Sequence, residues 1–401
     1  MLLPLDFIEK LIDLQDIKVT SVNVNNGIVE INAESKYSFA MCPKCKKITN
    51  QIHDKRVQPY LHLKICDKNT IINLTLRRFI CPCDAEHPFT ESFSFIRKYQ
   101  RQTIPYEKFI FALCDKNTIK NIANFTNLSH DKVQGIFNHY ANNAIHNREK
   151  VTPTYLGIDD IAVLKGHNYL TVIYNQSTGS IIDIFHGRTT EIVTKEIKNQ
   201  FTLIDRESVK AVSIDMSRAF KGAINNCFPN ADIVIDRFHI SQHLHNQIDK
   251  ARKHIQNKIR KETGNKNKVF GIRWSLLKNF EDLTATEMDT LLTVCDEYPK
   301  LGHCLALKEE FRKFFDIITK DEANAFIDYF EILVTEYDIP ELKEFCKTLN
   351  NWREGILSYY DHFITNGFVE GMNHKVKNIK RRAFNYRNND NFKIRVLYEC
   401  A

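Results

Sequence analysis

Short apolar runs alternate with helical segments between residues 151 and 240. Five runs predict β-strands because they are short, rich in β-branched and aromatic residues, and bounded by turn residues; they span 155–164, 168–175, 181–185, 209–215 and 231–236. A helical pattern follows the third strand, from Arg188 to Leu203, and helix starts follow the fourth and fifth. A meander of three strands, then strands that alternate with helices, indicates a mixed sheet covered by helices.

The strand pattern stops near residue 240, and helical periodicity dominates as far as about residue 350. We therefore expect the sheet domain in two parts, 151–240 and 355–401, separated by a helical insertion at 241–354. The second part contains a predicted helix with Asn366 as its N-cap. Apolar residues at steps of three and four give this helix one buried face, formed by Val369, Met372, Val376 and Ile379.

The N-terminal segment carries two pairs of cysteines. Cys42 and Cys45 form a Cys-x-x-Cys knuckle, and Cys81 and Cys83 follow a stretch rich in β-forming residues. Two such pairs can bind one tetrahedral Zn²⁺ in a zinc ribbon. Only one residue separates Cys81 from Cys83, so His87 is an alternative fourth ligand. We expect structural zinc in a small domain with little core of its own; buried free cysteines are the alternative.

A helix-turn-helix pattern follows in residues 96–150, after the zinc-binding domain of 1–95. A short helix with Ile122 and Ala123 facing inward precedes a turn near Asn127, and Ser129 caps a second helix. Short helix pairs also occur in unrelated proteins, so the pattern alone is not specific. In a DNA-binding motif the second helix would present polar side chains to a groove, namely Lys132, Gln134 and Asn138.

Composition and charge narrow the class of partner. The chain has 401 residues, a net charge of +7 and 11 cysteines. Two stretches, 250–273 and 374–387, are strongly basic, which points to nucleic acid because no apolar run approaches the length of a membrane span. The N-terminus lacks the features of a signal peptide, so we expect a cytosolic protein with reduced cysteines.

Three acids stand where they could meet at one point. Asp159 lies in the first predicted strand, Asp215 ends the fourth, and Glu370 lies on the late helix among many cations. Carboxylates brought together repel one another unless a cation compensates, and hard divalent ions with oxygen ligands are the natural compensation. The alternative is that Asp159 and Asp215 are turn or capping residues and that Glu370 belongs to a solvated helix face.

Four motifs in order resemble those of insertion-sequence transposases of the ISL-three type. They are Gly157-Ile-Asp159-Asp160, Ser213-Ile-Asp215-Met216, Asp236-Arg-Phe-His239 and Asn366-Gly-Phe-Val-Glu370-Gly-Met-Asn373, the last followed by Lys377 and Lys380-Arg381-Arg382. The resemblance covers nearly the whole chain, including the cysteine knuckle and the helix-turn-helix.

This resemblance implies a ribonuclease-H-like catalytic core with an Asp-Asp-Glu triad at Asp159, Asp215 and Glu370. The triad would bind two Mg²⁺ ions, for which Mn²⁺ could substitute, and would cleave and join DNA strands. Asp236, His239 and Asn373 would support the site. Only one of the Asp159–Asp160 pair can face the site, because side chains alternate along a strand.

The resemblance also implies double-stranded DNA as the partner, both at the terminal inverted repeats of the element and at the target. The chain would act as a homo-oligomer on DNA, in the cytoplasm and associated with the bacterial nucleoid. Lys377, Lys380, Arg381 and Arg382 would contact phosphates, which gives affinity with little sequence information. Two alternatives share these motifs: a non-catalytic DNA-binding regulator derived from a transposase, and a structure-specific nuclease.

Overall fold

The computed structural model describes residues 4–162, 169–264, 269, 271–365 and 367–400. The predicted cap Asn366 and the ends of two predicted strands, within residues 163–168, lie outside the described residues. The chain forms two compact units, Met1–Asn147 and Arg148–Ala401. Each is described by itself below.

The first unit begins with a five-stranded sheet in the order β1-β2-β6-β5, with β7 pairing to β6. Its strands are β1 Ile17–Asn25, β2 Ile28–Ser35, β5 Ile52–Ile65, β6 Lys68–Cys81 and β7 Asp84–Thr90; the short strands β3 Ala40–Met41 and β4 Ile48–Thr49 pair separately. Strands β2 and β6 run parallel, and the other pairs run antiparallel.

This sheet has a hydrophobic core, which corrects the expectation of a zinc-binding domain with little core of its own. Alternate residues of β6 are buried, including Ile72 and Leu74, as the period of two in a half-buried strand requires. They pack with Ile17, Ile31 and helix α1 (Leu5–Ile12) in one cluster. The long hairpin β5–β6 supplies this core, and its β-rich sequence between the cysteine pairs was the available signal.

Three helices complete the first unit: α2 Ile104–Leu113, α3 Ile119–Thr126 and α4 His130–His146. The side chains of Thr103, Thr118 and Ser129 cap the helix N-termini, and Asn127 ends α3 in the left-handed conformation. Ile122 and Ala123 are buried, as predicted. The turn between α3 and α4 therefore lies where the sequence placed it.

The second unit contains a five-stranded mixed sheet in the order β10-β9-β8-β11-β12. Its strands are β8 Tyr155–Ala162, β9 Tyr169–Asn175, β10 Ser180–His186, β11 Ala211–Ile214 and β12 Asp232–Ile235, and the helices between them are α5 Thr190–Gln200, α6 Leu203–Ser208 and α7 Arg218–Cys227. Strands β8, β9 and β10 form an antiparallel meander, whereas β8, β11 and β12 run parallel. The sequence predicted this mixed arrangement.

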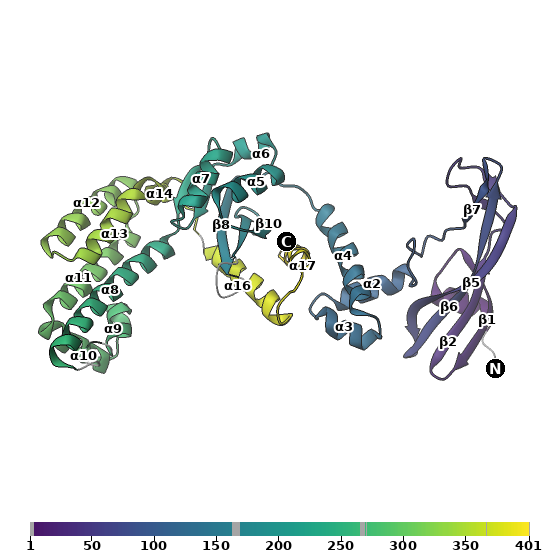
Figure 1. Cartoon of the computed structure of the whole chain (residues 1–401), viewed down its shortest axis with the longest axis horizontal. Coiled ribbons are helices and arrows are strands. Elements are labelled where there is room, and N and C mark those ends of the chain that lie inside the picture. The colour runs from purple at the N-terminus through teal and green to yellow at the C-terminus, as the bar shows by residue number, and fades with distance from the viewer. Residues whose placement is uncertain (1–3, 163–168, 265–268, 270, 366, 401) are drawn as a thin grey trace. The chain divides into compact units, whose positions relative to one another are not determined.

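Helices cover both faces of this sheet (Figure 1). On one face, Ile158 and Ile214 pack in a common core with residues of α5 and α7, such as Val193 and Phe220. On the other face lies α16 (Gly367–Arg382), and α17 (Asn389–Glu399) packs beside β10. The sheet is thus the middle layer of three.

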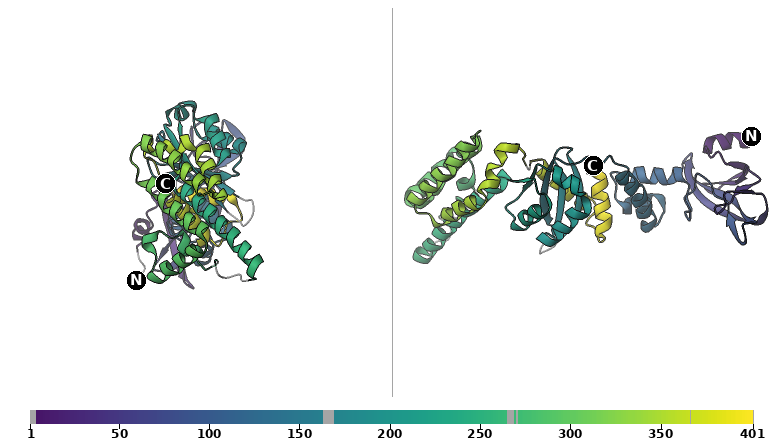
Figure 2. Two further views of the ribbon diagram at one scale, coloured as in Figure 1. Left: turned by 90° about the vertical axis from the view of Figure 1, so that its left-hand side faces the viewer. Right: turned by 90° about the horizontal axis from the view of Figure 1, so that it is seen from above.

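A helical insertion separates β12 from α16. Its elements are α8 Arg237–Thr263, α9 Arg273–Leu277, η1 Phe280–Asp282, α10 Ala285–Glu297, α11 Pro299–Arg312, η2 Lys313–Asp316, α12 Lys320–Glu336, α13 Pro340–Asn351, α14 Arg353–Leu357 and α15 Tyr359–His362. Figure 2 shows the longer helices packed side by side. Their core is aromatic, with Phe311, Phe314, Phe330 and Phe345 all buried. Among the described helices, none has the length and apolarity needed to cross a membrane.

Candidate active site

Three aspartates occupy one row across β8, β11 and β12, directly after the last residues that pair in parallel. Ile158 pairs with Ile214, and Ile214 pairs with Ile235. The next residue in each chain is Asp159, Asp215 and Asp236, respectively. Residues in register on parallel strands share a face, and neighbouring strands lie about 4.8 Å apart. Ile158 and Ile214 pack with α5 and α7, so the aspartates face the opposite side of the sheet, where α16 lies.

Gly157 lets α16 approach this face closely. A Cβ atom at Gly157 would lie 2.7 Å from Cγ2 of Val369, a contact that real side chains do not tolerate. Val369 is fully buried, and Glu370 is the next residue along the helix. Val369, Met372, Val376 and Ile379 are all buried, as their spacing predicted. The contact at Gly157 therefore sets the depth at which α16 brings Glu370 to the aspartates.

Hydrogen bonds hold the Asp159 carboxylate in place. Asn373 donates from Nδ2 to Oδ2 of Asp159 at 2.6 Å, and the Asp160 amide donates to Oδ1 at 2.7 Å. The buried hydroxyl of Tyr174 donates in turn to Oδ1 of Asn373. Burial raises the pKa of Asp159, and these hydrogen bonds oppose the rise. Each carboxylate oxygen can accept two hydrogen bonds, so both retain a lone pair for a cation.

Asp215 has an unsatisfied buried oxygen. Its Oδ1 is buried and accepts no hydrogen bond. Burial and the neighbouring Asp159 carboxylate raise the pKa of Asp215 to about 6. A buried acceptor without a partner destabilises a fold, and a cation bound to this oxygen would remove that cost. The oxygen donors of this row are the ligands that Mg²⁺ or Mn²⁺ prefers.

Asp236 and Glu370 form the other side of the site. Asp236 caps α8 through the amide of Phe238, and its Oδ2 lies 3.7 Å from Nε2 of His239. Burial raises the pKa of Asp236, and repulsion from Glu370 adds to the rise. Glu370 is exposed on α16. The carboxylates of Asp159, Asp215 and Glu370 do not all lie within 4.8 Å of one another; among the described residues, only the four cysteines form a group of three or more ligands at that spacing.

Asp160 does not share the face of these acids, although its charge adds to the rise in the pKa of Asp159 and of Asp215. Its Oδ2 accepts a hydrogen bond from Arg188 at 3.2 Å, and that guanidinium stacks on Tyr169 with 4.0 Å to the ring centroid. Strand alternation turns Asp160 away from the face of Asp159. The alternation of side chains along a strand predicted this difference between Asp159 and Asp160.

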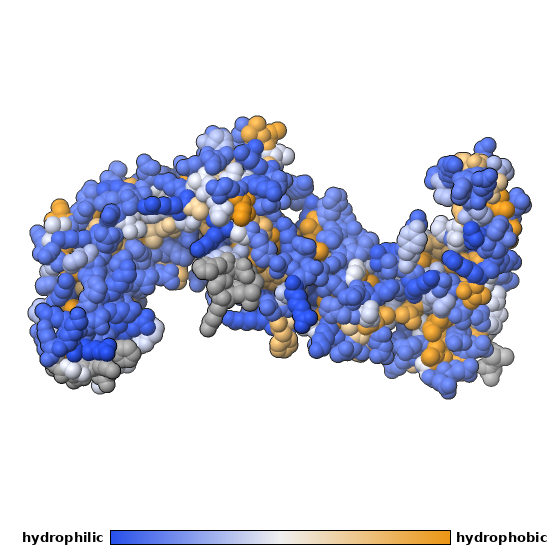
Figure 3. Space-filling view, in the orientation of Figure 1, coloured by the Kyte–Doolittle hydropathy of each residue, from blue (hydrophilic) through white to orange (hydrophobic). Residues whose placement is uncertain are grey.

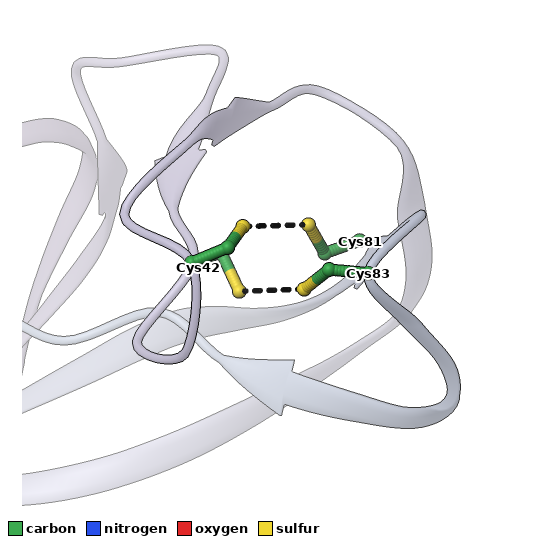
Figure 4. Close-up of side chains that lie close together, drawn as sticks. Cys42, Cys81 and Cys83 are labelled. Atoms are coloured by element: carbon green, nitrogen blue, oxygen red, sulfur yellow. Dashed lines mark hydrogen bonds between the residues drawn. The ribbon is translucent and has the colours of Figure 1, made fainter.

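Four cysteines gather at one end of the first unit. The sulfurs of Cys42, Cys45, Cys81 and Cys83 all lie within 4.8 Å of one another. Two facing pairs are visible in Figure 4, with Cys42 3.6 Å from Cys83 and Cys45 3.5 Å from Cys81. Hydrogen bonds from the backbone amides of Cys45 and Lys44 lower the pKa of Cys42 to about 6, which favours the thiolate that binds metal.

His87, the alternative fourth ligand, lies apart from the cysteine cluster. Its Nδ1 is 2.8 Å from Oδ1 of Asp84, and its side chain is 76% exposed. The geometry therefore favours Cys83 over His87 as the fourth donor. A set of four thiols is suited to tetrahedral zinc.

The polar residues of α4 are partly shielded. Ser129 caps the helix by accepting from the Lys132 amide at 3.3 Å. Gln134 donates to Asn138 at 2.8 Å, one turn further along the helix. Lys132 and Gln134 are both half-buried. Residues two positions apart lie on different sides of a helix, so these two do not present one surface.

The cations that follow Glu370 differ in their surroundings. Lys377 and Arg381 are exposed, and Lys380 is half-buried, which lowers its pKa. Arg382 forms an ion pair with Glu399 of α17. Its charge is therefore partly neutralised within the protein, in contrast to those of Lys377 and Arg381.

The structural roles of two residues of this site were not predicted from the sequence. Tyr174 orients Asn373 from β9, but nothing in an ordinary apolar strand marks it out. Gly157 could have been found, because a glycine within a strand pattern often indicates close approach of another segment.

Three family models match the three parts of the chain described above. A family model described as a transposase matches residues 156–396, which is more than half of the chain. A model for the helix-turn-helix domain of transposase family ISL3 matches residues 91–141, and one for the zinc finger of the transposases of IS204, IS1001, IS1096 and IS1165 matches residues 38–83.

Curated relatives carry the same description. The chain is 25% identical over 357 residues to the transposase for insertion sequence element IS1001 of Bordetella parapertussis, covering 89% of this chain and 87% of the relative. It is 24% identical over 254 residues to the transposase for IS1557 of Mycobacterium tuberculosis, covering 58% of this chain and 56% of that relative. With its zinc ribbon, helix-turn-helix and acidic sheet domain, the chain belongs to transposase family ISL3 and is a DDE-type DNA transposase.

Proposed function

We propose that this transposase binds the ends of its insertion sequence, cleaves a DNA strand there and joins the freed 3′-hydroxyl to target DNA. The observation that carries the proposal is the row of aspartates with an unsatisfied oxygen on Asp215, toward which α16 brings Glu370. The strand order, an antiparallel meander followed by parallel strands with helices on both faces, supports a ribonuclease-H-like core.

Asp159, Asp215 and Glu370 are the proposed ligands of two Mg²⁺ ions. When bound, such ions activate a water or hydroxyl nucleophile and stabilise the leaving oxygen at phosphorus. The protein fixes the geometry: Asn373 and the Asp160 amide orient the Asp159 carboxylate. Asp236 and His239 have a supporting role in this proposal. His239 is close enough to Asp215 to affect its pKa, and Asp236 is close enough to Glu370 to be repelled by it, but neither belongs to the triad.

The ion pair between Arg382 and Glu399 changes the expected DNA contacts. Lys377 and Arg381 are the best candidates for phosphate contacts, since both are exposed on the helix that carries Glu370. Lys380 adds a third charge beside them. Lys132 and Gln134 of α4 are proposed to contact the element ends from two sides of their helix.

A plasmid nicking assay with Mg²⁺ or Mn²⁺ tests the proposal. Asp215→Asn and Glu370→Gln should abolish metal-dependent nicking and leave DNA binding intact. Asp289→Asn, which removes an exposed charge of α10, is the matched control and should nick normally. Nicking by both site variants at the wild-type rate would refute the triad.

A strand-transfer assay separates transposition from simple nuclease activity. A labelled oligonucleotide with a free 3′-hydroxyl at an element end should become joined to a target plasmid. Nicking without joining would instead support a nuclease, and end binding without nicking a regulator.

A further inference from the structure

A pocket lies beside the acidic row, under the second half of α16. Its volume is about 350 Å³, at the lower end of the range for ligand pockets. Its floor is apolar and buried, formed by Ile161, Leu170, Val376 and Phe392. Ile161 is two residues after Asp159 on β8, so the pocket opens on the same face of the sheet as the acids.

Phe384 stands at the rim of this pocket in a conformation that is unusual for an aromatic residue. Its φ of 53° is left-handed, and its side chain is 93% exposed. The amide of Asn385 bonds to the carbonyl of Lys380, and that of Phe384 to the carbonyl of Arg381. This is the Schellman pattern, in which glycine usually takes the left-handed position.

An exposed phenylalanine at that position is disfavoured in two ways. The left-handed backbone crowds its Cβ, and its ring meets water. The space-filling view shows apolar surface at this end of α16, surrounded by hydrophilic residues (Figure 3). A flat apolar ligand stacked on the ring would remove the second disadvantage, because it would shield the ring from water.

The charge of the pocket indicates an anionic ligand. Lys377, Lys380 and Arg381 line it together with Phe384, and none of its described lining residues is acidic. Aromatic rings beside cations are the usual surroundings of an unpaired nucleotide, whose base stacks while its phosphates pair with the cations.

The position of the pocket relative to Glu370 fits a DNA strand. Lys377 follows Glu370 by seven residues on α16, or about 10 Å at about 1.5 Å per residue. This equals the rise of about three nucleotides along the axis of a duplex, at about 3.4 Å each. A strand whose phosphate is at the acidic row would therefore pass the pocket a few nucleotides away.

We propose that this pocket binds one unstacked base of the DNA strand that runs through the active site. Phe384 stacks on the base, and Lys377 and Arg381 contact the phosphates on either side. Stacking on Phe384 thus fixes the position of the DNA strand relative to the acidic row, and every base can make this contact. This inference rests on the proposed function, since it assumes that the acidic row acts on DNA.

Binding of single-stranded oligonucleotides to the full chain tests the inference. The probes are a fluorescein-labelled thymidine decamer and a decamer of the same length in which abasic sites replace the bases, so that their phosphates are equal in number. Wild-type protein should bind the thymidine decamer at least about 5-fold more tightly, as expected for one stacked base. Phe384→Ala should bring this ratio close to one.

Phe363→Ala is the matched control. Phe363 also belongs to the second unit, is 65% exposed and has a left-handed φ of 50°, but it is not among the residues that line the pocket. Its substitution should leave the ratio unchanged. Lys377→Ala should weaken both probes equally, because it removes a phosphate contact.

The outcomes separate this inference from the proposed function. A ratio unaffected by Phe384→Ala overturns the base pocket, even if the protein nicks plasmid with Mg²⁺. A ratio that falls only in Phe384→Ala supports the pocket, even if no nicking is seen. Cross-linking of a 5-iodouracil decamer to Phe384 would support it further, and cross-linking only to residues outside the pocket would overturn it.

Discussion

Replacing Asp215 by asparagine should make the metal-free protein more stable while it abolishes strand cleavage. In the folded protein the pKa of Asp215 is about 6, against an ordinary value of 3.8. The folded state therefore holds the Asp215 proton more tightly than the unfolded state does. The stability of the fold falls as the pH rises above 3.8, and the loss is complete above about pH 6. Asparagine keeps the shape of the side chain and removes the charge that faces Asp159.

The size of the effect follows from the shift. About two pKa units at about 1.4 kcal/mol each give roughly 3 kcal/mol as an upper limit, since Asp215 keeps some contact with water. We expect a gain of about 1–3 kcal/mol for the unit Arg148–Ala401 at pH 8. At about 2–4 °C per kcal/mol for a domain of this size, its melting temperature should rise by about 2–12 °C.

Thermal melts in a metal chelator at pH 8 and pH 5 measure this effect. The gain should be full at pH 8 and should shrink as the pH falls through 6, because wild-type Asp215 then takes up its proton. Added Mn²⁺ should stabilise the wild type and have little effect on Asp215→Asn. Asp289→Asn, an exposed charge in the same unit, should change stability little at either pH.

Two results would refute this reasoning. One is an Asp215→Asn protein that is less stable than wild type in chelator at pH 8, since the Asp215 charge would then not destabilise the fold. The other is equal stabilisation of both proteins by Mn²⁺, since the ion would then bind elsewhere.

Three further predictions concern other parts of the chain. Cys83→Ser should lower the zinc content and expose the segment 40–49 to protease while the sheet of the first unit persists, whereas His87→Ala should retain zinc; the reverse pattern in metal analysis would favour the histidine as ligand. Gly157→Ala should lower nicking at least tenfold, because the added Cβ would push α16 away from the sheet. Gly371→Ala should nick normally, because a Cβ added there would have no other atom within 4 Å, and equal activity of the two variants would contradict the close approach at Gly157. Arg381→Ala should reduce the slope of log affinity against log salt for duplex DNA by about 0.9, and an unchanged slope would exclude a phosphate contact there.

Much of the fold could be predicted from the sequence because its signals are local. The short apolar runs before Asp215 and Asp236 predicted buried parallel strands. The spacing of Val369, Met372 and Val376 predicted a helix with one buried face. The caps at Ser129 and Asn127 marked the helix-turn-helix for the same reason. These signals depend on residues within a few positions of each other.

The sequence by itself also identified the candidate acids, but the tertiary structure decided how they are arranged. Strand register put Asp236 in the same row as Asp159 and Asp215, and the packing of α16 on the sheet placed Glu370 where it repels Asp236. The tertiary structure also brought Cys83, and not His87, to the cysteine cluster, and it paired Arg382 with Glu399. Such outcomes depend on contacts between segments far apart in the chain, whose free energies come from burial and packing rather than from local pattern.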